Sequence, residues 1–327
     1  MLNRCAKTAS ISPENIMLKL WKKTTAKTTA PDESMRVPRE TGPGTRSVYP
    51  PAFEITASLR SDPGCVRAVN EDRCFYQQPD DEGLFRRKGI LVLVADGMGG
   101  HAAGEIASHN AIEIISRVYY DSTQPPTAAL ETAFHTANQA IHRAAQRQPQ
   151  LHGMGTTCTA LVIHEGSAYS AQVGDSRLYL VRNDQIYLMS EDHSAVMEMV
   201  RRGKMTLEEA RHHEDKNVIL RALGTQPEVR VAMWKTPFPV RDHDCFVLCS
   251  DGLYDLVSDE EIRQTVMTSK PRAACEKLIA LARERGGYDN ITAGIIRLCL
   301  APAADETSVP PTRELKPMAL TGEKQEA

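Results

Sequence analysis

The sequence predicts an α+β fold in which antiparallel β-sheets are combined with segregated helices. Strand patterns follow one another without helices between them along residues 156–190, and helical patterns come in pairs before and after the strand-rich part. Successive strands of this kind are joined by hairpins, whereas a parallel sheet needs a long crossover after each strand. The order of elements therefore argues against a doubly wound parallel sheet.

Seven segments show the strand pattern, because each is a short apolar run bounded by glycine or polar turn residues. They are ILVLVA (90–95), TTCTALVIH (156–164), AYSAQVG (168–174), SRLYLV (176–181), QIYLMS (185–190), CFVLCS (245–250) and ITAGIIRL (291–298). Asn183-Asp184 separates the fourth segment from the fifth and suits a tight hairpin turn.

Helical periodicity occupies two stretches between the first and second strands. Apolar residues recur three and four positions apart within 107–118 and again within 130–144. Two further helices are expected to begin at capping boxes, in which Ser or Thr is followed three residues later by Glu. These boxes are Thr206 with Glu209 and Ser258 with Glu261.

Composition places the chain among ordinary globular proteins. Of 327 residues, 41% are hydrophobic and 25% are charged, and the formal net charge is −3. This charge gives no indication of a nucleic-acid partner, and no apolar run approaches the roughly 20 residues of a membrane-spanning helix. The eight cysteines form no C-x-x-C pair, so we expect reduced, buried thiols in a monomeric cytoplasmic protein.

Both ends of the chain differ from the rest. Residues 1–52 are rich in Thr, Lys, Arg and Pro without a sustained apolar period, and residues 301–327 are polar and contain proline. Such segments bury too little apolar surface to fold. We therefore expect two disordered tails around one domain at 53–300.

Acidic residues recur where apolar strands begin or end. One Asp-Gly pair is more often a turn, but several carboxylates at one sheet edge repel each other unless cations neutralise them. Oxygen ligands favour Mg²⁺, Mn²⁺ or Ca²⁺ over zinc or copper. A two-metal site can hold an activated water for attack on phosphorus. The candidates are Glu71, Asp72, Asp96, Asp175, Asp192, Asp251 and Asp289; alone, they indicate an acidic metal site and leave the reaction open.

An ordered set of motifs resembles one family. The chain carries R-x-x-N-E-D (67–72), V-A-D-G-M-G-G-H (94–101), G-T-T (155–157), V-G-D-S-R (173–177), D-H-S (192–194), S-D-G-L (250–253) and Y-D-N-I-T (288–292). Together these resemble the metal-dependent, type 2C serine/threonine protein phosphatases, in the form found in the bacterial branch. The resemblance covers about 57–298. It implies a four-layer α-β-β-α sandwich with a metal centre at one end and a phosphatase domain at 53–300.

The resemblance implies roles for the residues that match these motifs. Asp96 is similar to the Asp that bridges two metal ions, and the carbonyl of Gly97 to a ligand of one of them. Asp251 and Asp289 resemble the ligands of the first ion.

Asp72, with Glu71 beside it, resembles the residues around the second ion, which contact that ion largely through water. Asp175 resembles the ligand of a third, weaker site in bacterial members. Arg67 resembles the phosphate-binding arginine, because its planar fork suits a phosphate dianion. Taken alone, Arg67 would be interpreted as part of a surface ion pair.

The implied activity is hydrolysis of phosphoserine and phosphothreonine in proteins by a water that two Mn²⁺ or Mg²⁺ ions activate. Such an enzyme opposes Ser/Thr protein kinases, so phosphoproteins, a kinase and its substrates are the expected partners. The leaving alkoxide needs a proton, and Met98 stands where eukaryotic relatives have histidine. A thioether cannot donate a proton. His101 or a metal-bound water is the candidate donor; the alternative for His101 is a polar residue that satisfies the loop or the next helix.

Two further segments have open interpretations. Residues 195–223 lie where bacterial relatives carry a flap at the rim of the site, and either recognise substrate or form a solvated helix pair. Asp192-His193 is expected to have a structural role near the sheet edge.

Three rival functions use the same residues. A pseudophosphatase would keep the fold without turnover, but the intact acids of the motifs argue against it. A hydrolase of small phosphate esters and an interaction module with acidic turns are the others.

Overall fold

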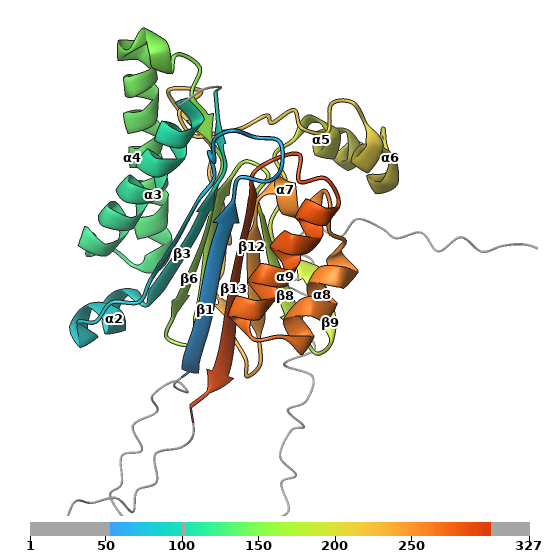
Figure 1. Cartoon of the computed structure of the whole chain (residues 1–327). Helices are drawn as coiled ribbons and strands as arrows, with labels where there is room; N and C mark the ends of the chain where they lie inside the picture. The colour runs from blue at the N-terminus through green and yellow to red at the C-terminus, as the bar shows by residue number, and fades with distance from the viewer. Residues whose placement is uncertain (1–52, 100–102, 302–327) are drawn as a thin grey trace, which may run out of the picture.

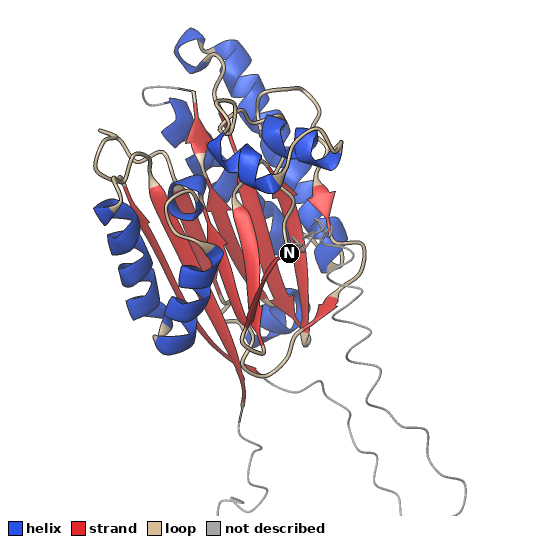
Figure 2. Cartoon of the chain, turned by 90° about the vertical axis from the view of Figure 1, so that its right-hand side faces the viewer, coloured by secondary structure: helices blue, strands red, loops and turns tan. Residues whose placement is uncertain are grey.

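The computed structural model of the chain describes residues 53–99 and 103–301. Apart from Ala301, the tails predicted at 1–52 and 301–327 lie outside the described residues, and so does His101. Two antiparallel sheets pack face to face between two groups of helices, as Figures 1 and 2 show. The predicted α+β class and the four-layer α-β-β-α arrangement are confirmed.

Each large sheet is built from hairpins and long returns of the chain. The first sheet has the order β1 (Phe53–Asp62), β13 (Ile291–Leu300), β12 (Cys245–Cys249), β8 (Arg177–Arg182), β9 (Gln185–Leu188). The second has the order β10 (Ala232–Met233), β7 (Ser167–Val173), β6 (Cys158–His164), β3 (Ile90–Ala95), β2 (Arg73–Gln77), with β11 (Phe238–Pro239) also beside β7. A small separate sheet pairs β4 (Gly97–Met98) with β5 (Gly155–Thr156). All these pairs are antiparallel.

The helices form two outer layers and a separate lobe (Figure 1). The second sheet is covered by α3 (Ala103–Asp121) and α4 (Pro126–Arg147), and the first by α7 (Asp251–Tyr254), α8 (Asp259–Thr268) and α9 (Pro271–Glu284). The short α2 (Glu82–Lys88) precedes β3, η1 (Pro149–Leu151) follows α4, and α5 (Ala195–Arg201) and α6 (Leu207–His212) form the lobe. None of the described helices is long and apolar enough to cross a membrane.

Strand β3 explains why the sheets are apolar on both faces. Side chains alternate across a strand, and Leu91, Leu93 and Ala95 pack beneath α3 and α4. Ile90 and the two valines of the strand face the opposite sheet. A third cluster fills the space between the first sheet and its helices. The four layers therefore enclose three apolar cores, with β3 and its counterparts in the other sheet buried on both sides.

The predicted elements and the observed ones differ mainly at the edges. All seven predicted strands are present, although the second is divided at Thr157 into β5 and β6. Both capping boxes form, and Asn183 and Asp184 have the positive φ angles, 51° and 58°, of a tight turn. The two-residue strands β4, β10 and β11 were not predicted, and neither were the longer β1 and β2. Both carry polar or charged side chains between their apolar ones and lie at sheet edges, where the apolar signal is weakest.

Candidate metal centre

Strand ends from both sheets carry the predicted carboxylates to one place. In the second sheet β3 ends where β2 begins, so Asp96 after β3 adjoins Asp72 before β2. In the first sheet β12 ends beside the beginnings of β13 and β8. Asp251 follows β12, Asp289 precedes β13 and Asp175 precedes β8. Antiparallel pairing thus gathers five acids at one end of the sandwich.

The backbone of Asp96 is held by the two threonines of the G-T-T segment, through both their hydroxyls and a backbone N–H. The Asp96 N–H donates to Thr157 Oγ1 at 3.0 Å, and the Asp96 carbonyl accepts from the Thr157 N–H at 2.8 Å and from Thr156 Oγ1 at 2.9 Å. Thr157 Oγ1 also lies 2.7 Å from Ser176 Oγ, next to Asp175. The motifs around Asp96 and Asp175 are therefore fixed to each other as well as to their strands.

Mutual repulsion and burial dominate the electrostatics of the cluster. Burial raises the pKa of Asp96 well above its ordinary value, and the charges of Asp72, Asp251, Asp175 and Asp289 raise it further. Burial and the neighbouring acids likewise raise the pKa of Asp251. The pKa of Asp72 rises to about 6 and that of Asp175 to about 7, in both cases mainly through burial. These acids are close enough to repel one another strongly, and few positively charged side chains among the described residues neutralise them.

Several carboxylate oxygens of the cluster lack protein partners. Among the described residues, buried Glu71 Oε1, Asp72 Oδ1 and Asp251 Oδ1 have no hydrogen-bond partner. Buried polar atoms are rarely left in this state, and a bound cation would satisfy them. The donor set is entirely oxygen, which suits Mg²⁺ or Mn²⁺. Within the described part of the chain, no three of these acids place one oxygen each within 4.8 Å of one another, so they do not form a compact shell for a single ion.

Two glycines let the backbone close around the acids. A Cβ on Gly97 would lie 2.1 Å from the carbonyl oxygen of Gly104 and 2.8 Å from that of Glu71. A Cβ on Gly104 would lie 2.5 Å from Glu71 Oε1. These contacts are too close for any side chain. The start of α3, β4 and the Glu71 segment therefore touch through their backbones, and this places Gly97 within the cluster.

Arg67 stands at the exposed side of the cluster on a loop that Asn290 fixes. Its guanidinium donates to Asp289 at 2.8 Å, and this hydrogen bond raises the pKa of Arg67. Asn290 Nδ2 donates to the carbonyls of Pro63 and Val69, each at 3.0 Å, and Asn290 Oδ1 accepts from the Glu71 N–H at 2.8 Å. The residue after Asp289 thus holds the loop that presents Arg67.

Arg177 joins three of the segments that surround the cluster. Its guanidinium donates twice to Asp192 Oδ2, at 2.7 and 3.0 Å, and once to the hydroxyl of Tyr179 at 2.9 Å. It also stacks on the ring of Tyr254, with its central carbon 3.7 Å from the ring centroid. Tyr254 lies one helical turn after Asp251. Arg177 therefore positions both α7 and the Asp192 segment beside the acids.

His193 has the structural role expected of it. Its imidazole Nδ1 accepts from the Gly174 N–H at 3.1 Å, and the backbone N–H of His193 donates to the Gly174 carbonyl at 3.1 Å. Burial, and then the charge of Arg221, lowers the pKa of His193 to about 4. The neutral imidazole thus fixes the turn before Asp175.

In the flap segment, residues 195–223, Lys216 Nζ pairs with Asp255 at 2.5 Å.

Sequence reasoning missed two residues that support the site. Ser250 Oγ donates to Asp72 Oδ2 at 2.7 Å and accepts from the Thr292 N–H at 3.0 Å, which joins the two sheets at the cluster. The negative charge of Asp255 helps to raise the pKa values of Asp175 and Asp251. The signal for Asp255 was its spacing of four from Asp251, which places both on one face of a helix.

We predict that Arg177→Met lowers the free energy of unfolding by about 3–5 kcal/mol, because it leaves a buried carboxylate unpaired. The side chain of Asp192 is only 4% exposed. Urea unfolding measures the loss. Arg86→Met is the matched control, since Arg86 and Glu82 are 68% and 77% exposed, and its midpoint should stay close to that of the wild type. Equal midpoints for the two variants would contradict the positioning role of Arg177.

Comparisons with known proteins agree with this geometry. Residues 66–280 match the family model described as protein phosphatase 2C. A serine/threonine phosphatase stp of Listeria innocua is 38% identical over 246 residues, which cover 72% of this chain and 93% of that protein.

Two solved structures extend the match to the fold. The serine/threonine phosphatase PstP/Ppp of Mycobacterium tuberculosis has a TM-score of 0.67 and 36% identity, covering 75% of this chain and 99% of that one. The catalytic domain of PstP in complex with two manganese ions has a TM-score of 0.64 and 34% identity, covering 76% of this chain and 100% of that one. Motifs, fold and relatives lead to one conclusion: the chain belongs to the protein phosphatase 2C family.

Proposed function

We propose that this chain is a metal-dependent serine/threonine protein phosphatase that hydrolyses phosphoserine and phosphothreonine in proteins. The observation that carries the proposal is the gathering of five acids at one end of the sandwich. Buried oxygens of two of them, Asp72 and Asp251, and of the adjacent Glu71 have no hydrogen-bond partner among the described residues. The named relatives support the reaction, since the stp protein of Listeria innocua and PstP of Mycobacterium tuberculosis are both called serine/threonine phosphatases.

The all-oxygen donor set at the centre, with its unpartnered buried oxygens, suits Mn²⁺ or Mg²⁺, and the acids would draw closer together around two such ions. Asp96 would be shared by the two ions and the carbonyl of Gly97 would bind one of them. Asp251 and Asp289 would hold the first ion, and Asp72 with Glu71 the second. The crystallised PstP domain with two manganese ions supports this number. Bound ions of this kind lower the pKa of a water, so that it can attack phosphorus at neutral pH. Asp175 is the candidate for a third, weaker site.

Arg67 would bind the phosphoryl group of the substrate. Its guanidinium lies at the exposed side of the acids, with half of the side chain accessible, and can offer two parallel donors to phosphate oxygens. The charge that develops on those oxygens in the transition state would be stabilised by the same fork. Its present partner, Asp289, keeps the fork directed towards the cluster.

The proposal extends to the setting in which the reaction takes place. We infer that residues 53–300 act as the catalytic domain, as a cytoplasmic monomer. Its substrates would be phosphoproteins made by a Ser/Thr kinase, including the kinase itself. The exposed flap that carries Lys216 is the segment through which these proteins would contact the rim of the site.

The purified chain should release phosphate from a phosphothreonine peptide only when Mn²⁺ or Mg²⁺ is added. Asp251→Asn should lose essentially all turnover and keep the wild-type circular dichroism spectrum, because it removes a ligand from the end of a strand. Asp80→Asn, an exposed loop residue, should keep full activity.

Three outcomes would contradict this proposal. Activity that persists in chelator would exclude the metal mechanism. Turnover of p-nitrophenyl phosphate without turnover of the peptide would favour a hydrolase of small esters, and a folded, metal-binding but inactive chain would favour a pseudophosphatase.

His101 is the proposed proton donor to the departing alkoxide, with a metal-bound water as the alternative. Because a poor leaving group needs the proton more, His101→Ala should reduce turnover of phosphoserine peptide much more than that of p-nitrophenyl phosphate. Steady-state kinetics on both substrates test the assignment. An equal loss on the two substrates would remove His101 from this role.

A further inference from the structure

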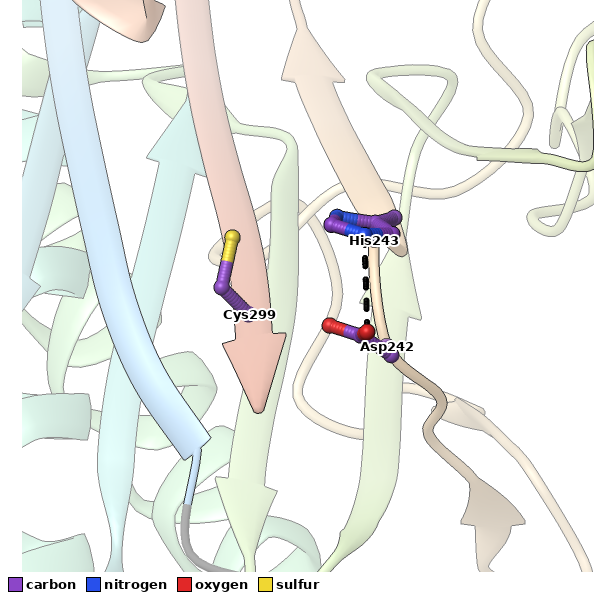
Figure 3. A group of neighbouring side chains, drawn as sticks. All are labelled: Asp242, His243 and Cys299. Carbon is purple, nitrogen blue, oxygen red and sulfur yellow. Dashed lines mark ion pairs between the residues drawn. The ribbon is translucent and has the colours of Figure 1, made fainter. Parts of the chain in front are cut away.

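A second group of metal-binding side chains lies at the other end of the first sheet. Figure 3 shows Asp242 and His243 in the turn before β12, with Cys299 near the end of the adjacent β13. Strand β13 starts beside the acidic cluster and Cys299 is eight residues further on, which is roughly 26 Å along a strand. The two groups are therefore independent of each other.

The three side chains have the spacing of ligands around one ion. One donor atom from each of Asp242, His243 and Cys299 lies within 4.8 Å of the other two. His243 Nε2 is 3.4 Å from Asp242 Oδ2. Zinc bonds of about 2.0–2.1 Å at a tetrahedral angle separate two such atoms by about 3.3 Å. In Figure 3 the imidazole and the carboxylate both extend towards the strand that carries Cys299.

Hydrogen bonds to β13 fix the turn in this position. Leu300 N–H donates to Asp242 Oδ1 at 2.8 Å, so the other carboxylate oxygen faces the imidazole. The N–H of His243 donates to the Leu298 carbonyl at 3.0 Å, and the Leu298 N–H donates to the Asp244 carbonyl at 2.9 Å. The backbone on both sides of Cys299 is therefore attached to the turn that carries the other two donors.

The sheet register supplies a fourth donor. Cys299 pairs directly with Glu54 of β1, and paired residues of antiparallel strands project from the same face with Cβ atoms about 4.5–5.5 Å apart. Glu54 is exposed, so its flexible carboxylate can reach an ion held by Cys299. With Glu54 turned towards the three donors, a thiolate, an imidazole and two carboxylates would give an ion four ligands.

We propose that Asp242, His243 and Cys299, completed by Glu54, bind one Zn²⁺ ion. Thiolate and imidazole ligands distinguish this site from the all-oxygen centre and select zinc over Mg²⁺ or Mn²⁺. Binding would release the thiol proton of Cys299 to solvent. The ion would join β1, β13 and the turn before β12, and thereby hold the end of the first sheet together.

Cobalt(II) provides a test with the full chain, because a thiolate bound to cobalt gives a charge-transfer band in the near ultraviolet. The acids assigned to the other centre contribute no sulfur. We expect Co²⁺, added beyond the equivalents that the acidic centre can take, to produce the band, Zn²⁺ to abolish it, and Cys299→Ser to remove it. Cys65→Ser, which changes an exposed cysteine, should leave it intact.

Two conservative variants separate ligation from folding. His243 has a φ of 63°, a conformation that Asn also adopts, and Asp242→Asn keeps an acceptor for the Leu300 N–H. Both His243→Asn and Asp242→Asn should weaken zinc binding at least about tenfold, since even outer partners of ligands contribute about 10–100-fold. Manganese-dependent phosphatase activity should be unchanged. Absence of the cobalt band, or a band that survives in Cys299→Ser, would overturn the proposal.

Discussion

Repulsion among buried carboxylates is the constraint on which the rest of the structure depends. Asp96 lies within the field of four other acids, and burial raises its pKa even before their charges act. Such a group is unfavourable in a fold unless something of opposite charge is bound. The surrounding backbone therefore has to hold the acids together against their own charge, and the four-layer sandwich supplies that rigidity through its three apolar cores.

The acids are held mainly by neutral partners, which leaves their charge available to cations. Hydroxyl groups of Thr157 and Ser250 fix Asp96 and Asp72, and Asn290 fixes the loop that carries Arg67. Arg177 supplies a buried positive charge, but its guanidinium is hydrogen-bonded to Asp192 and Tyr179, so it supports the acids indirectly. The arrangement separates the groups that position the site from those that would contact ions and phosphate.

Much of this could be predicted from the sequence, because the strong signals were local. Apolar runs such as ILVLVA predicted buried strands, and acids at their ends predicted an edge site. Register and partners could not be predicted, because they depend on segments distant in sequence. Ser250 reaches Asp72 across 178 residues, and Glu54 meets Cys299 only through the pairing of β1 with β13. Neither contact produces a repeating pattern of residues from which it could be predicted.

If metal ions relieve the charge repulsion in the cluster, thermal unfolding of Asp96→Asn shows it most directly. The acids' raised pKa values mean that their ionisation disfavours the folded state as the pH rises through those values. At neutral pH in chelator, Asp96→Asn should therefore melt at a higher temperature than the wild type. Adding Mn²⁺ should stabilise the wild type strongly and the variant little. A variant that melts lower in chelator, together with a wild type that Mn²⁺ does not stabilise, would contradict relief of the repulsion by metal ions.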